Sequence, residues 1–315
     1  MEPARHTGLS SAAMVVGKDL LLDLIEATRG DLDAVDTLIW VSIVQANLGP
    51  VMARSDLESA YAVQPPPDEL RRPISVAALA GATGLPFETV RRRVARLRDR
   101  GRCEIGPDGV IVPQRSLETP AHAAVIMDNY RVLQRTFRRL EVLGFFDGQA
   151  WPATAWRPGD PPPLRASVRH SADYCLRIVD QLRVRTGDVL NGLILFQLVR
   201  ETTAALGDSR DRFQQPNGPA LAPDAVKTPV GASLIAERLR VDRETVRRRL
   251  VSLTAEGLVA RRGAGYILPV ESMMRLKTDE LIEVNDANLR RLYRGLAKVG
   301  AIEAWRAEAE SAAAA

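Results

Sequence analysis

Cysteine and histidine are scarce in this chain of 315 residues, which contains two cysteines and three histidines. The spacing of Cys103 and Cys175 suggests neither a disulfide framework nor a metal site. His6, His122 and His170 are isolated, and no cluster of histidine, cysteine and aspartate has the spacing of metal ligands. The sequence also lacks a phosphate-binding glycine loop and a nucleophile elbow. These absences argue against an enzyme and predict no cofactor and no metal.

Long hydrophobic runs are also missing. No apolar stretch reaches the roughly 20 residues that span a membrane, and the N-terminal segment lacks the charged start and apolar run of a secretory signal. We therefore expect a cytoplasmic, nucleoid-associated protein with no membrane partner. A hydrophobic content of 46% over this length is enough for two domains, each with its own core.

The charge is mildly basic, with a formal net charge of +4 and a pI near 9.3. Almost all of the positive charge is arginine, whose forked guanidinium suits phosphates and guanine edges better than lysine does. A GC-rich genome produces the same bias, so composition alone leaves both explanations open.

A long stretch of the sequence occurs twice. Residues 73–113 align without a gap to residues 229–269, and Glu-Thr-Val-Arg-Arg-Arg stands at 88–93 and again at 244–249, an offset of 156. The register continues through Gly144 and Gly300, beyond the matched stretch. The chain is therefore a duplicated domain. We predict a flexible tail over 1–17, a first unit over 18–146, a proline-rich linker over 147–172, a second unit over 173–305 and a tail over 306–315.

The second copy predicts two helices joined by a turn and followed by a hairpin. Residues 233–239 suit a short helix, and Asp242 can cap a second helix whose buried stripe is Val246, Leu250 and Leu253. Two short strand-like runs then flank the glycines at 263 and 265, which permit a tight turn. The fold class expected is mainly α with small β-hairpin wings: two tandem winged helix-turn-helix domains, each with flanking long helices.

This stretch resembles the DNA-binding module of bacterial winged-helix transcriptional regulators, most closely the GntR type. The residues that carry the resemblance are Ile235-Ala236, Thr245-Val246-Arg247, Glu256-Gly257-Leu258-Val259 and Arg262-Gly263-Ala264-Gly265. The resemblance covers only the module, and the effector domain that usually follows a GntR-type module is absent. It implies a regulator that binds double-stranded DNA, with contacts at the positions of Arg243, Thr245 and Arg247.

The helical wheel supports part of that set independently. With Val246 facing inward, Arg247 and Arg248 face outward, where a helix in the major groove meets base edges and phosphates. Arg261 and Arg262 on the wing are expected to hold the DNA backbone or minor groove. The complete set of expected DNA-binding residues is Thr89, Arg91, Arg92, Arg243, Thr245, Arg247, Arg248, Arg261 and Arg262.

The first copy departs from the second around its recognition helix. Phe87 replaces Arg243, Pro86 replaces the capping Asp242, and the wing carries acidic residues at 104 and 108 where the second copy carries alanine. Either both helices read DNA with unequal half-sites, which we favour, or the first copy has been adapted to contact protein.

Each unit also contains a strongly apolar helix, one around Trp40 and one around Phe196, which the alignment pairs with each other. Such a helix is either the core of its domain or an interface between halves or chains, and we favour the interface. A homodimer could form there if both helices remain partly uncovered. Trp151 and Trp156 are expected to pack onto a domain although they lie in the linker.

The function expected is a transcriptional regulator in which one chain acts as its own pseudo-dimer on an imperfect palindrome or repeat. The alternatives are a replication initiator or a chromosome-organising protein with tandem winged helices. The sequence does not identify an operator sequence or a small-molecule effector.

Overall fold

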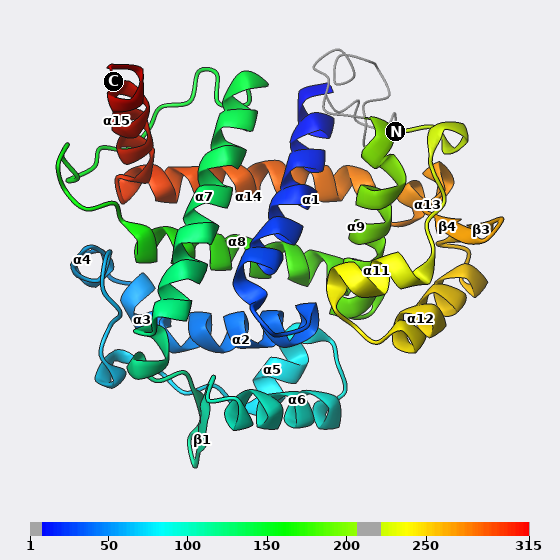
Figure 1. Cartoon of the computed structure of the whole chain (residues 1–315), viewed down its shortest axis with the longest axis horizontal. Helices are drawn as coiled ribbons and strands as arrows, with labels where there is room; N and C mark the ends of the chain where they lie inside the picture. The colour runs from blue at the N-terminus through cyan, green and yellow to red at the C-terminus, as the bar shows by residue number, and fades with distance from the viewer. Residues whose placement is uncertain (1–7, 207–221, 315) are drawn as a thin grey trace.

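The computed structural model describes residues 8–206 and 222–314, which form a mainly helical structure with two small antiparallel strand pairs (Figure 1). The expectation of a mainly helical fold with small hairpins is confirmed. The elements of the first half are α1 (Gly8–Arg29), α2 (Ala34–Asn47), α3 (Gly49–Met52), α4 (Ser55–Ala60), η1 (Asp68–Leu70), α5 (Val76–Thr83), α6 (Phe87–Asp99), β1 (Glu104–Gly106), β2 (Gly109–Ile111), η2 (Gln114–Leu117) and α7 (Pro120–Val142).

The second half repeats this order with small changes. Its elements are α8 (Leu164–Thr186), α9 (Val189–Thr203), η3 (Ala204–Leu206), η5 (Asp224–Val226), α11 (Ala232–Leu239), α12 (Arg243–Ala255), β3 (Ala260–Arg262), β4 (Gly265–Ile267), α13 (Val270–Arg275), α14 (Thr278–Lys298) and α15 (Ala301–Ala314). We call residues 73–113 the first module and residues 229–269 the second module.

The four long helices α1, α7, α8 and α14 form a central body in which the halves interlock (Figure 1). The helix α1 packs on both α7 and α14, and α8 does the same. Tyr174 on α8 donates a hydrogen bond to the backbone oxygen of Gly17 on α1, at 3.1 Å, and Asn285 on α14 donates to Ala13 O, at 3.1 Å. The buried side chains of both halves belong to one continuous core. The expectation of a separate core for each half is therefore wrong.

The predicted tail over 1–17 is also wrong for the residues described. Residues 8–17 form the first turns of α1, where Ala12, Ala13 and Val16 are buried. This segment is built of small residues that give no clear apolar stripe, and its helix is stabilised by packing on the other half. Residues 1–7 of the expected tail lie outside the described part of the chain.

The linker is shorter than predicted, because α8 begins at Leu164 and takes up the last nine residues of the expected 147–172 segment. Pro163 stands at the N-cap of α8, where a missing amide proton costs nothing. The prediction that the linker tryptophans pack is confirmed. Trp151 lies 5.2 Å from Phe146 between ring centroids, and the Cβ of Trp156 lies against Gly300. The expected tail 306–315 continues α15 as far as its last described residue.

The apolar helices α2 and α9 begin at corresponding caps, which corrects the alignment. The Asp33 side chain accepts from Asp36 N and the Asp188 side chain accepts from Asn191 N, so the offset in these helices is 155 (33 to 188) and not 156. Arg72 N donates to Asn47 O just as Thr228 N donates to Thr202 O, and the second connection is one residue longer. Trp40 therefore corresponds to Leu195. An ungapped alignment from the modules cannot detect that extra residue.

Both apolar helices are covered within the chain. The helix α2 packs on α1, α6 and α8, and α9 packs on α8, α11 and α1, so each lies where the two halves meet. Trp40 is 6% exposed and Phe196 is 7% exposed. Both side chains are thus largely covered, although each lines an open apolar pocket, and the homodimer stays a prediction.

Candidate nucleic-acid interface

Each module places two short helices at the surface with a hairpin beside them. In the first, Ser75 caps α5, and Gly84 adopts a left-handed conformation with φ of 70° in the turn before α6. In the second, Asp242 caps α12 by accepting from Thr245 N, at 2.8 Å. The hairpins pair Ile105 with Val110 and Arg261 with Tyr266. Of these features, the cap at Asp242 is the one from which α12 was predicted.

The inward faces of α6 and α12 correspond residue by residue. Val90, Val94 and Leu97 are fully buried in the first module, and Val246, Leu250 and Leu253 are fully buried in the second. Because these positions fix the rotation of each helix, the side chains on the opposite face are directed to the surface, among them Arg91 and Arg92 on α6 and Arg247 and Arg248 on α12. The outward faces of α6 and α12 thus follow from their apolar stripes.

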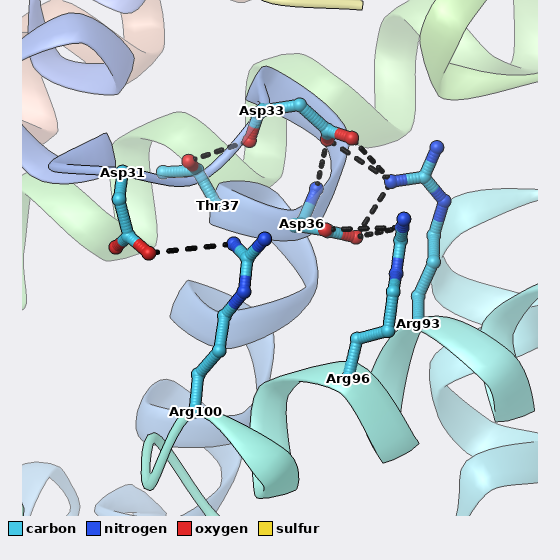
Figure 2. A network of polar contacts seen from close by, with 7 residues as sticks. All are labelled: Asp31, Asp33, Asp36, Thr37, Arg93, Arg96 and Arg100. Atoms are coloured by element: carbon cyan, nitrogen blue, oxygen red, sulfur yellow. Dashed lines mark hydrogen bonds and ion pairs between the residues drawn. The ribbon is translucent and has the colours of Figure 1, made fainter.

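The third arginine of each triplet does not lie on the outward face. Figure 2 shows Arg93 extending from α6 to the start of α2, where its Nη1 lies 2.8 Å from Asp33 and 2.6 Å from Asp36. Arg96 also contacts Asp36, at 3.1 Å. In the second half, Arg249 Nη1 lies 2.6 Å from the carboxylate of Asp188. Both arginines therefore anchor their helix to the acidic cap of an apolar helix.

Sequence reasoning missed this anchor. The available signal was the pair of aspartates that begin α2 and α9, Asp33 and Asp188, each of which follows a glycine-containing break. An aspartate at a helix start pairs with an arginine only if the fold brings the two side chains together. Here they are about 60 residues apart, so the sequence alone does not indicate the pairing. The third arginine is a positioning residue in both modules.

The first two arginines of each triplet are exposed, as expected. Arg91 is paired with Glu88 by two hydrogen bonds of 2.8 and 2.7 Å, and Arg247 is paired with Glu244 by two of 2.7 Å. The side chains of Arg91 and Arg247 are 57% and 52% exposed. Hydrogen bonds from Arg247 lower the pKa of Glu244 to about 2. These pairs lie on the helix surface, where solvent and salt screen them, so a phosphate can compete for either guanidinium.

The remaining expected residues of the second module are also at the surface. Arg248 and Arg243 are exposed on α12, and Arg261 and Arg262 are exposed on β3. Thr245 is half-buried, and its hydroxyl donates to Asp242 Oδ2 at 3.1 Å, so in the free protein it reinforces the cap. Arg262 lies 4.0 Å from Asp224. The helix α12 and the strand β3 thus present five exposed guanidinium groups.

The first module presents a different surface at the corresponding positions. Arg91 and Arg92 are exposed and Thr89 is half-buried, but Phe87, Ile105 and Gly106 stand where the second module carries Arg243, Arg261 and Arg262. Glu104 on the hairpin pairs with Arg115. The replacements on the hairpin follow from the sequence itself, because the offset of 156 pairs Ile105 with Arg261 and Gly106 with Arg262.

The two modules lie at neighbouring edges of the molecule, and the hairpins stand at the outer ends of α6 and α12 (Figure 1). Since each hairpin follows the C-terminal end of its helix, the N-terminal ends of α6 and α12 lie on the sides that face each other in this view (Figure 1). The turn of each module also rests on the other half. Gly84 lies against Gly187 and Arg183 at the end of α8, and Arg240 donates to Gly30 O at the end of α1.

No family model, curated protein or solved structure matches this chain.

The two cysteines, Cys103 and Cys175, are free thiols buried in the core. Burial raises the pKa of the Cys103 thiol to about 11 and that of Cys175 to about 12, so both remain protonated at neutral pH. Within residues 8–206 and 222–314, no group of three or more histidine, cysteine or acidic side chains is placed to hold a metal ion. In the same residues no helix combines the length and the hydropathy needed to cross a membrane.

Proposed function

We propose that this protein is a sequence-specific double-stranded DNA-binding transcriptional regulator whose two modules act as winged helix-turn-helix domains of one intramolecular pseudo-dimer. The observation that supports this most directly is the repeated outward pair, Arg91-Arg92 on α6 and Arg247-Arg248 on α12. Both pairs are exposed although the third arginine of each triplet is committed to an aspartate. Solvation of the chain does not require the same two exposed guanidinium groups on corresponding faces of both helices.

The arrangement of the modules suits a duplex. In dimeric regulators two recognition helices enter successive major grooves about 34 Å apart, and the dimer interface fixes that spacing. Here the interlocked core of α1, α7, α8 and α14 takes the place of such an interface. The hairpins at the outer ends of α6 and α12 would then follow the flanking backbone or minor groove.

The pairing of Arg91 and Arg247 with glutamates is compatible with this role. Glu88 and Glu244 occupy the first turn of their helices, from which an acidic side chain can accept from the amino group of cytosine. An arginine released from its glutamate by a phosphate or a guanine leaves that carboxylate free to do so. Each glutamate-arginine pair is therefore proposed to be a readout pair that rearranges on DNA.

The test is selection of bound fragments from random or genomic DNA with the purified full chain, followed by affinity measurement at several salt concentrations. We expect an imperfect palindrome or repeat, with nanomolar affinity that falls steeply with salt. Weak binding without sequence preference would count against the proposal. A genome-wide binding profile separates a regulator, found at promoters, from an initiator or chromosome-organising protein, found at clustered repeats or broadly.

A further inference from the structure

The feature that the proposed function leaves unexplained is the apolar surface of the first module. Phe87 is 52% exposed and Ile105 is 44% exposed, and both belong to the few large hydrophobic side chains at the surface of the described residues. Phe87 is the first residue of α6, as Arg243 is of α12. Ile105 pairs with Val110 on the hairpin just as Arg261 pairs with Tyr266.

Resting on the proposed function, we infer that Phe87 is a specificity-determining residue that contacts the 5-methyl group of a thymine, at the position where Arg243 contacts a guanine in the other half-site. The first turn of a recognition helix is the part that reaches base edges. An aromatic ring there can bind the thymine methyl but can donate no hydrogen bond to guanine or phosphate, whereas arginine binds guanine O6 and N7. The two half-sites of the operator are accordingly recognised by different contacts, an apolar contact to a thymine methyl in one and hydrogen bonds to a guanine in the other.

The surroundings of Phe87 favour DNA over a protein partner. Arg91 lies one helical turn farther along the same face, and the exposed Arg92 follows it. The two exposed guanidinium groups give this surface the positive charge that attracts phosphates, so the apolar ring beside them can meet a base edge. Over residues 87–93, the α6 surface therefore differs in charge from residues 243–249 of α12 only at its first residue.

The hairpins extend the asymmetry to affinity. The second hairpin brings Arg261 and Arg262 to the DNA, and the first brings Ile105 and Gly106, with Glu104 next to them. Each guanidinium that neutralises a phosphate releases counterions, so the second module supplies most of the salt-dependent affinity. The first module contributes discrimination through apolar contact. The chain thereby binds its site in one orientation.

The experiment uses the full chain and a duplex obtained by selection. Each thymine of the duplex is replaced in turn by deoxyuridine, which lacks the methyl group, and the dissociation constant is measured for the wild type and for Phe87→Ala. We expect one or two thymines of a single half-site to show about a fourfold loss, the effect of one buried methyl group, and expect Phe87→Ala to abolish that loss. Phe87→Arg should shift the preference at the same position to guanine.

The matched control is Arg243→Ala, measured on duplexes in which 7-deazaguanine removes the N7 acceptor of each guanine. The 7-deazaguanine substitutions whose effect disappears in Arg243→Ala should lie in the other half-site. Arg243→Ala should leave the loss of affinity caused by deoxyuridine unchanged. If the wild type binds the selected duplex tightly but no thymine methyl matters, or if the effect persists in Phe87→Ala, the inference is overturned while the proposed function stands. If selection enriches no DNA at all, the proposed function and the inference fall together. Circular dichroism checks that the variants remain folded.

Discussion

Arg93 on α6 bridges the carboxylates of Asp33 and Asp36 at distances of 2.8 and 2.6 Å, and this contact holds the first module against the start of α2. The second module repeats it with Arg249 and Asp188. The three arginines of each triplet thus have two different roles. The first two side chains point outward and are available to a ligand, and the third fixes the orientation of the helix that carries them. This division leads to the first prediction.

Replacement of Arg93 by methionine should lower the free energy of unfolding by about 1 to 3 kcal/mol. The change leaves Asp33 without its guanidinium and leaves the buried Asp36 with Arg96 alone. Urea denaturation of the full chain measures the loss. Arg91→Met, at an exposed position of the same helix, is the matched control and should unfold at the wild-type urea concentration. Equal midpoints for the two variants would contradict the anchoring role of Arg93.

Replacement of Arg247 or Arg248 by alanine should weaken binding to the selected duplex by roughly 5- to 150-fold, because each removes a direct contact to a base or phosphate. The equivalent changes at Arg91 and Arg92 test whether the first module also reads DNA. Arg131→Ala serves as a control, since Arg131 is exposed on α7, which belongs to neither module. Unchanged affinity in both Arg247→Ala and Arg248→Ala would show that the recognition helix is misassigned.

The salt dependence should separate the two hairpins. Arg261→Ala should reduce the slope of the logarithm of the binding constant against the logarithm of salt concentration by about 1, because one phosphate contact is lost. Ile105→Ala, at the corresponding position of the first hairpin, carries no charge and should leave the slope unchanged. Fluorescence anisotropy over a series of salt concentrations measures both. If neither substitution changed the slope, Arg261 would not contact a phosphate and would not belong to the interface.

The close contact between α1 and α14 predicts that the halves do not fold separately. A Cβ added at Gly17 would lie 2.2 Å from the side-chain oxygen of Asn285, so Gly17→Ala should cost about 1 to 3 kcal/mol of stability through overpacking. Gly49→Ala is the control, because nothing lies within 4 Å of a Cβ at that position. Residues 1–163 expressed alone should fail to unfold cooperatively. Cooperative unfolding of that fragment would contradict the single shared core.

His122 should make the fold sensitive to mild acid. Burial, with smaller contributions from Arg165 and Arg102, lowers the pKa of His122 from 6.5 to about 4. Between these two values the unfolded chain binds a proton that the folded chain does not, so the stability is fully present above pH 6.5 and is lost as the pH falls toward 4. We expect a loss of about 2 kcal/mol at pH 5 relative to pH 7.5 from this group.

The comparison for this prediction is His122→Gln, which carries no titrating ring. Denaturation curves at pH 5 and pH 7.5 should differ less for that variant than for the wild type, whatever its absolute stability. A pH dependence of the same size in both proteins would assign the effect to other groups, among them the partly buried carboxylates.

Much of the module architecture was predictable because its signals are local. A cap at Asp242, an apolar stripe at helical spacing and a glycine turn are each short-range features, and the stripe and the second turn glycine recur in the first copy as Val90, Val94, Leu97 and Gly109. The exposure of Arg247 followed from the position of Val246 alone. The features that the sequence did not predict depend on long-range packing. The helix over 8–17, the residue slip that pairs Trp40 with Leu195 and the anchor from Arg93 to Asp33 all depend on segments far apart in the sequence.

The sequence by itself determined that the chain contains two copies of one unit, that each copy has a capped helix with a fixed buried side, and that two arginines of each triplet point outward. Periodicity and capping act over one or two turns, so a single sequence contains them in full. Only the tertiary structure decided that the two copies share a core, that the apolar helices are covered within one chain and that the third arginine is held by an aspartate. Those outcomes depend on which surfaces meet, and that is set by shape and charge between residues 60 to 272 positions apart.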